Sequence, residues 1–213
     1  MEATRVIAVR HGETAWNVEA RMQGHLDIGL NATGQWQARR VSEALADEAF
    51  DAIYSSDLSR AWETALEIAR PRALQVRPEP RLRERAFGRF EGMSFAEIEG
   101  TLPDQARLWR QRDPVFAPEG GESLLAFRDR VAGATAELAA RHPGELILLE
   151  AHGGVMGGLS RAAPRHPLEA PRTWRLGNAS INRVLWTPEG FSLVGWDDSA
   201  HLAAPPTDDA STA

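Results

Sequence analysis

Two short apolar runs, each followed by a histidine, constrain the fold of this chain most. Residues 5–9 lead through Arg10 to His11, and residues 145–151 lead directly to His152. Runs of this kind are typical of strands that are buried on both faces, as in parallel sheets. Because ligands in such sheets bind at the carboxyl ends of the strands, the two histidines are expected to face one crevice.

Segments with helical spacing separate these runs from other strand-like stretches. Thr33 is expected to cap the first long helix, and Pro71 follows the end of the second. The predicted strands are residues 5–9, 52–55, 74–76, 145–151, 181–186 and 191–196. The predicted helices are residues 33–45, 59–69 and 122–141, with one opening at Gly153 and short ones near Phe95 and Leu108. This order predicts an α/β fold, a three-layer α/β/α sandwich with a mainly parallel mixed sheet and a closing hairpin.

The chain of 213 residues has no internal linker, which favours one domain over residues 1–202. Residues 203–213 are rich in Ala, Pro, Thr and Asp and are expected to form a disordered tail. The N-terminus lacks a signal-peptide pattern, and no stretch has the length of a membrane span. We therefore expect a cytoplasmic protein that does not bind membranes.

Charge and residue usage exclude several chemistries. A formal net charge of -6 argues against nucleic acid binding by bulk electrostatics. The 24 basic residues are all arginine, so lysine nucleophiles and Schiff bases are excluded. The absence of cysteine excludes thiolate nucleophiles and zinc–thiolate sites. A phosphate clamp in this chain must consist of guanidinium groups or backbone N–H groups.

The tripeptide Arg10-His11-Gly12 suits attack on a phosphate ester. Neutral imidazole is available near neutral pH and needs no separate base. An adjacent arginine can hold two phosphate oxygens with its planar fork, and a glycine allows close approach of the backbone. A tripeptide alone is weak evidence, but its place after a buried strand favours a site.

Three further elements complete a candidate constellation. Arg60 lies in the first turn of the helix that follows residues 52–55, although arginines at such positions usually face solvent. Glu84 could protonate a leaving alkoxide. His152 precedes Gly153, whose helix N-terminus favours anions, and a second imidazole there would stabilise a transferring phosphoryl group.

These elements, in this order, resemble the histidine phosphatase superfamily, also called phosphoglycerate mutase-like. The resemblance is carried by Arg10-His11-Gly12-Glu13-Thr14, by Arg21-x-Gln23-Gly24 and by the Ser-Asp-Leu-x-Arg-Ala-x-x-Thr-Ala string ending at Ala65. It extends from residue 5 to about residue 202.

The resemblance implies a role for each matching position. His11 would be the phosphorylated nucleophile, and Glu84 the proton donor. Arg10, Arg60 and His152 would complete the phosphate pocket, while the substrate or phosphate site would also be lined by Asn17, Gln23, Gly24 and the backbone of Gly153. The family uses neither metal nor cofactor, so none is expected here. A metal site at His11, His25, Asp27 and His152 lacks supporting ligand spacing.

Family members are phosphatases or mutases, which share the first half-reaction. The mutases carry a longer insert between the Glu84-like residue and the helix matching residues 122–141. The shorter interval here favours a phosphatase acting on a small phosphorylated metabolite. The alternatives are a 2,3-bisphosphoglycerate-dependent phosphoglycerate mutase and a phospho-ligand binding module without turnover.

The sequence does not identify the substrate. Residues 85–118 are expected to form the wall opposite the phosphate. There Arg107, Arg110 and Arg112 are interpreted as a solvated helix face. Trp109, Phe116 and Trp174 are candidates for stacking on a substrate, although packing is the more common role of such side chains. A homodimer formed through a sheet edge is a further expectation.

Overall fold

The computed structural model describes residues 2–162, 167–169 and 175–203. Trp174 and residues 204–213, which make up nearly all of the predicted tail, lie outside this range. Within the described residues, no helix combines the length and apolar character needed to cross a membrane.

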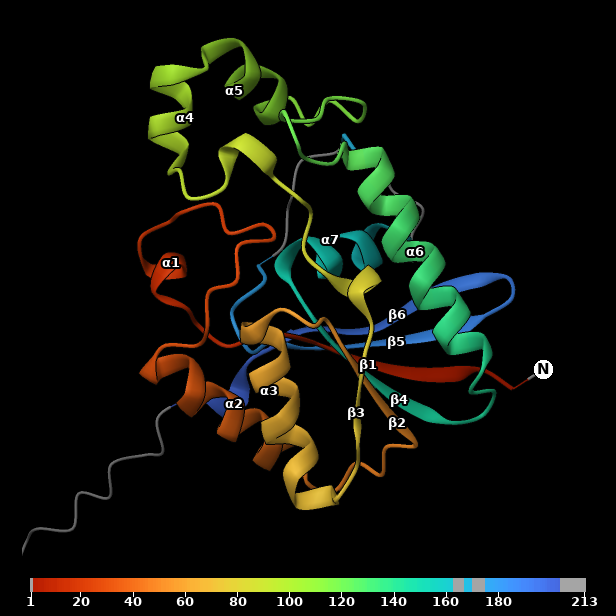
Figure 1. The fold of residues 1–213 in the computed structure, drawn as a ribbon. Coiled ribbons are helices and arrows are strands. Elements are labelled where there is room, and N and C mark those ends of the chain that lie inside the picture. The colour runs from red at the N-terminus through yellow and green to blue at the C-terminus, as the bar shows by residue number, and fades with distance from the viewer. Residues whose placement is uncertain (1, 163–166, 170–174, 204–213) are drawn as a thin grey trace, which may run out of the picture.

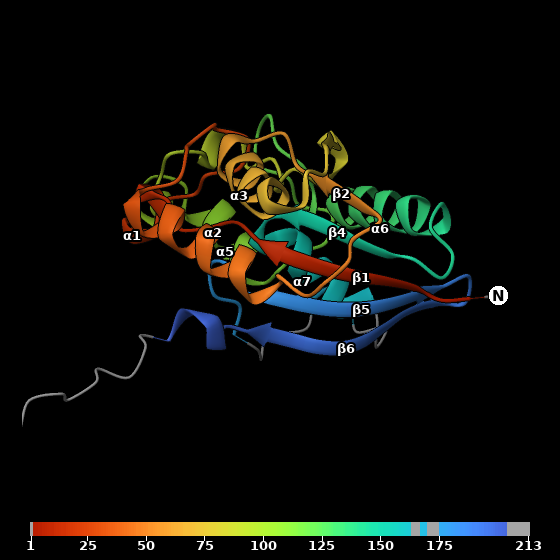
Figure 2. The ribbon, with the colours of Figure 1, turned by 90° about the horizontal axis from the view of Figure 1, so that it is seen from below.

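A mixed sheet forms the middle layer of the fold (Figure 1). Its strand order is β3-β2-β4-β1-β5-β6. Neighbours from β3 to β1 pair in parallel, whereas β5 pairs antiparallel with both β1 and β6. Figure 2 shows β5 and β6 side by side beyond β1. The strands are β1 Thr4–Arg10, β2 Ala52–Ser55, β3 Val76–Pro78, β4 Leu146–Ala151, β5 Ile181–Thr187 and β6 Gly190–Asp198.

Helices cover both faces of the sheet. They are α1 Ala15–Val18, α2 Ala32–Ala44, α3 Ser59–Ala69, α4 Phe95–Thr101, α5 Pro103–Arg110, α6 Leu124–Ala140 and α7 Gly153–Ala162. Alternate residues of β4 face opposite layers, so Leu148 packs with residues of α2 and α3, and Leu149 with residues of α6 and α7. The predicted three-layer α/β/α sandwich with a mainly parallel mixed sheet is confirmed.

A smaller lobe stands apart from these layers. Helices α4 and α5 lie above the main body in Figure 1 and have their own core, centred on Phe90, Ile98 and Ala106. The lobe lies in the segment between Glu84 and α6, where the sequence predicts the wall opposite the phosphate.

Several predicted boundaries differ from the structure, and three of the differences have a clear cause. Helix α2 begins at Ala32, because Asn31 rather than Thr33 caps it, with its side chain accepting a hydrogen bond from Gly34 N. Ser123 caps α6, which therefore begins at Leu124 and not at residue 122. The third strand is Val76–Pro78 rather than residues 74–76, since these are the residues that pair with β2.

Glu150 is a buried carboxyl group in the middle of the sheet. It lies on β4 between Val9 of β1 and Ser55 of β2, and its exposed fraction is 0%. Neither carboxyl oxygen has a hydrogen-bond partner among the described residues. Burial raises the pKa of Glu150 well above 4.5, so the folded chain holds it as the neutral acid.

This burial predicts how Glu150→Gln changes stability. Above pH 4.5 the unfolded chain ionises Glu150 while the folded chain keeps it protonated, so the wild type loses stability as pH rises toward the raised folded pKa. The variant lacks this loss. Its free energy of unfolding, relative to wild type, is expected to increase by up to about 1.4 kcal/mol for each pH unit in that window.

Urea unfolding at several pH values between about pH 5 and pH 8 measures this difference. Glu119→Gln is the matched control, because that side chain is 82% exposed. A difference between Glu150→Gln and wild type that stays constant with pH would contradict the prediction.

Candidate active site

His11 and His152 lie side by side at one edge of the sheet. Each follows a strand, and β1 and β4 are parallel neighbours in which Arg10 pairs with Ala151. The two strands therefore deliver both imidazoles to the same place. The ring centroids are 5.2 Å apart at an interplanar angle of 59°, and both side chains are buried.

Hydrogen bonding fixes the tautomer of His11. Its Nδ1 lies 2.7 Å from Gly12 O. Because a carbonyl oxygen only accepts, Nδ1 carries the proton of the neutral ring, and Nε2 retains its lone pair. Gly12 is required here, since a Cβ would collide with the backbone of Gly34. The loop thus presents an unprotonated ring nitrogen beside a tightly packed backbone.

Ser56 is the hydrogen-bond partner of His152. His152 Nε2 lies 2.8 Å from Ser56 Oγ, which accepts a hydrogen bond from Leu58 N. In the tautomer where the Ser56 hydroxyl donates to Nε2, the ring proton of His152 is on Nδ1. That Nδ1 is buried without a hydrogen-bond partner among the described residues. Ser56 was not singled out from the sequence, although it is part of the quoted Ser-Asp-Leu string.

Electrostatics keeps both rings neutral. Burial lowers the pKa of His11 and of His152 well below 6.5. The positive charges of Arg60 and Arg10 lower both values further. An uncharged imidazole is the nucleophilic form, so the surroundings favour nucleophilic chemistry at neutral pH.

Arg60 turns inward from the first turn of α3, although an arginine in such a position usually faces solvent. Its side chain is fully buried, and its Nη1 and Nη2 donate to Leu26 O and Gly24 O at 2.9 and 2.8 Å. Burial lowers its pKa to about 10, so it remains a cation at neutral pH. Its Nε has no hydrogen-bond partner among the described residues. The structure thus brings a buried positive charge close to both histidines.

Arg10 supplies a second guanidinium to the same crevice. Its Nη1 donates to Leu176 O at 2.6 Å. The Arg10 guanidinium also lies against the start of α7: a Cβ added at Gly153 would be 3.5 Å from Arg10 Nε. A larger residue at this position would crowd the guanidinium.

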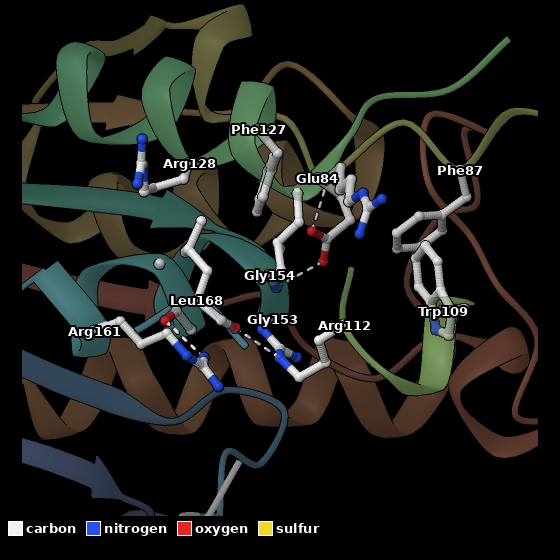
Figure 3. Close-up of a pocket in the computed structure, with 14 residues that line it drawn as sticks. Glu84, Phe87, Trp109, Arg112, Phe127, Arg128, Gly153, Gly154, Arg161 and Leu168 are labelled. Atoms are coloured by element: carbon white, nitrogen blue, oxygen red, sulfur yellow. Dashed lines mark hydrogen bonds between the residues drawn. The ribbon is translucent and has the colours of Figure 1, made fainter. Parts of the chain in front are cut away.

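Glu84 joins the site through the N-terminus of α7. Its Oε2 accepts from Gly154 N at 2.9 Å, and its Oε1 accepts from Arg85 N at 2.8 Å. Figure 3 shows the first of these bonds. Because Gly154 is two residues beyond His152, the carboxyl group is held next to the imidazole pair.

The remaining predicted residues surround this group with different contacts. The carbonyl of Gly24 holds Arg60, and Gln23 is buried with no hydrogen-bond partner for its Oε1 among the described residues. Asn17 Oδ1 accepts from Thr14 N at 3.0 Å and from Asn178 Nδ2 at 3.2 Å. The predicted positions thus support or border the crevice.

Asn178 is a site neighbour that the sequence did not reveal. Its Nδ2 also donates to His11 O at 3.1 Å. It lies in a loop before β5 with no motif around it, and its contact depends on two distant loops meeting.

The residues considered for a metal site have other partners. Asp27 accepts from Ser59 N and Oγ, and His25 Nε2 lies 2.8 Å from Glu84 O. Within the part of the chain that the structure describes, no group of three or more His, Asp or Glu side chains is placed to hold a metal ion.

A pocket of about 180 Å³ opens beside Glu84 (Figure 3). Its lining includes Trp109, Phe127 and Arg112. The interpretation of Arg112 as part of a solvated helix face was therefore wrong. Arg112 lies beyond the end of α5 with a positive φ of 54°, and its Nε donates to Leu168 O at 2.9 Å, which directs it into the pocket.

Comparisons with known proteins agree with this geometry. The family model of the histidine phosphatase superfamily (branch 1) matches residues 6–199. The chain is 38% identical to phosphoglycerate mutase-like protein 4 of Arabidopsis thaliana over 207 residues, covering 95% of this chain and 88% of that protein. It is 36% identical to glucosyl-3-phosphoglycerate phosphatase of Mycobacterium tuberculosis over 208 residues, covering 92% of this chain and 93% of that protein.

A solved structure supports the same assignment. Bacillus stearothermophilus YhfR superposes with a TM-score of 0.87 at 32% identity, covering 94% of this chain and 100% of that one. The family model spans nearly the whole chain, and the relatives match over most of their length. This chain belongs to the histidine phosphatase superfamily.

Proposed function

We propose that this chain is a metal-independent phosphomonoester hydrolase that acts on a small phosphorylated metabolite through phosphorylated His11. The observation that carries the proposal is the pair of neutral, buried imidazoles at 5.2 Å, with two arginines close enough to lower the pKa of both. The name of the mycobacterial relative, a glucosyl-3-phosphoglycerate phosphatase, supports hydrolysis as the reaction class.

In the first half-reaction, His11 Nε2 attacks the phosphorus atom. The new N–P bond forms as the P–O bond to the alcohol breaks. Glu84 in its acid form gives its proton to the leaving oxygen and becomes a carboxylate. Arg10, Arg60 Nε and His152 Nδ1–H bind the phosphoryl oxygens, whose charge grows in the transition state.

In the second half-reaction, water replaces the alcohol. The Glu84 carboxylate takes a proton from the attacking water, the O–P bond forms, and the N–P bond to His11 breaks. Inorganic phosphate leaves, and Glu84 is again protonated. Asn17, Gln23, Gly24 and Gly153 keep the arginines and the His11 loop in place or border the substrate, which makes them supporting positions in this scheme.

The competing reaction is phosphoglycerate mutation. A mutase must return the phosphoryl group from His11 to a phosphoglycerate instead of to water. To separate the two, purified protein is assayed for free phosphate from a panel of monoesters and for conversion of 3-phosphoglycerate to 2-phosphoglycerate. The proposal predicts phosphate release with little interconversion. Interconversion with almost no phosphate from any monoester would refute it.

The cytoplasmic location, the absence of nucleic acid and membrane partners, and the homodimer stay predictions from the sequence. Sedimentation of the purified chain measures its oligomeric state directly.

A further inference from the structure

The pocket beside Glu84 lies where the alcohol part of a substrate must leave. Glu84 and Gly153 belong to its lining, so it lies next to the site that holds the two imidazoles. Its volume of about 180 Å³ exceeds what a transferred phosphoryl group requires. If the proposed function holds, the shape and charge of this pocket determine which phosphomonoester is hydrolysed.

Aromatic side chains form its walls. Phe127 of α6, Trp109 of α5 and Phe87 line the cavity (Figure 3). The rings of Trp109 and Phe87 pack edge to face, with their centroids 5.3 Å apart. The Arg85 guanidinium lies over the Trp109 ring, 4.5 Å from its centroid, so both contacts hold the indole in place. Fixed aromatic faces suit a flat, partly apolar group.

The floor of the pocket is a face of α7 that consists mainly of glycines. Gly153, Gly154, Gly157 and Gly158 all line it, and their spacing puts them on one side of α7. A Cβ at Gly154 would overlap the Glu84 carboxylate, which explains that glycine.

Packing does not explain the next two glycines. A Cβ at Gly157 would lie 3.7 Å from Arg161 Nη1, and one at Gly158 would lie 3.8 Å from Val131 Cγ1. Both are ordinary van der Waals contacts, and glycine inside a helix costs stability relative to alanine. These two positions therefore keep the pocket open at the expense of helix stability.

The lining also carries more positive than negative charge. Its carboxylate is Glu84, whereas its arginines are Arg85, Arg112, Arg161 and Arg128, the last of which pairs with Asp129 outside the lining. Arg112 and Arg161 donate to the carbonyls of Leu168 and Gly157 (Figure 3), bonds that orient the guanidiniums without removing their charge. Such a lining favours an anionic substituent on the bound alcohol.

We propose that this pocket binds the alcohol part of the substrate, that this part is a ring-sized, partly apolar group with an anionic substituent, and that Gly157 determines specificity for it. The proposal rests on the phosphohydrolase activity proposed above. It distinguishes the chain from a phosphatase that recognises only the phosphate group.

The test compares ethyl phosphate, phenyl phosphate and 4-carboxyphenyl phosphate in wild type and in Gly157→Leu. Each substrate is compared between variants, so the different reactivities of alkyl and aryl esters cancel. Gly133→Leu is the matched control, because Gly133 is an exposed glycine of α6 at which a Cβ would meet nothing within 4 Å.

Gly157→Leu is expected to lower kcat/KM for 4-carboxyphenyl phosphate by at least about 10-fold, mainly through KM, and to change ethyl phosphate hydrolysis by less than about 2-fold. Wild type is expected to prefer the carboxylated ring to phenyl phosphate by about 10-fold. Gly133→Leu should behave as wild type.

Two results would overturn the inference while leaving the phosphohydrolase activity in place. One is that Gly157→Leu lowers kcat/KM equally for ethyl and ring-bearing esters. The other is that wild type shows no higher kcat/KM for the carboxylated ring than for phenyl phosphate. If no ester releases phosphate with wild type, the proposed function itself fails.

Discussion

His11→Ala is expected to abolish phosphate release, with a loss of about 10⁴-fold or more in kcat. The substitution removes the ring nitrogen that the structure presents with an available lone pair next to Arg60 and His152. His152 is not expected to replace it, because its Nε2 is already hydrogen-bonded to the Ser56 hydroxyl. Release of inorganic phosphate from phenyl phosphate, followed over hours, measures the residual rate.

The matched control is His142→Ala. His142 is also buried, but it bonds Tyr54 Oη and Glu145 at the opposite end of the strands. This variant is expected to be less stable and to keep its turnover where it is folded. Substantial activity in a folded His11→Ala protein would mean that water attacks the ester directly.

Glu84→Gln is expected to slow esters with poor leaving groups most. A glutamine keeps a side chain of similar shape at the N-terminus of α7 but cannot give a proton to the departing oxygen. Alkyl esters, whose alkoxides need that proton, should lose about 10²–10⁴-fold in kcat/KM. Nitrophenyl phosphate releases a stable anion without that proton and should lose far less.

This effect is measured with a series of esters whose leaving groups differ in basicity. In Glu84→Gln, kcat/KM should fall more steeply with leaving-group basicity than in wild type. Glu119→Gln, an exposed change in the same segment, should leave the slope unaltered. A uniform loss across the series would assign Glu84 to substrate positioning and not to proton transfer.

The sequence predicted the parts of the site that depend on strand ends. An apolar run predicts a buried strand. Because β1 and β4 are parallel neighbours, His11 and His152 reach the same edge of the sheet independently of the conformation of the loops. Arg60 lies near the same edge because α3 begins shortly after β2, but its inward orientation was expected only from the family resemblance. Local pattern therefore sufficed for residues whose position is set by the sheet.

Periodicity and motifs did not predict contacts between loops that are far apart in the sequence. Asn178 reaches the His11 loop from 167 residues away, and Arg112 enters the pocket because its backbone takes a positive φ after α5. Neither depends on periodicity or on a motif. Glu150 is a third case, since a charged residue in an otherwise apolar strand gives no indication of whether it finds a partner.

The central claim is a covalent bond between phosphorus and Nε2 of His11. Wild-type protein is mixed briefly with a labelled monoester, quenched in base to preserve phosphohistidine, and digested, and the modified peptide is located by mass spectrometry and phosphorus NMR. We predict one phosphoryl group on His11, attached at Nε2 because Nδ1 donates to Gly12 O. Label on Nδ1, label on another residue, or rapid phosphate release with no phosphohistidine would contradict it.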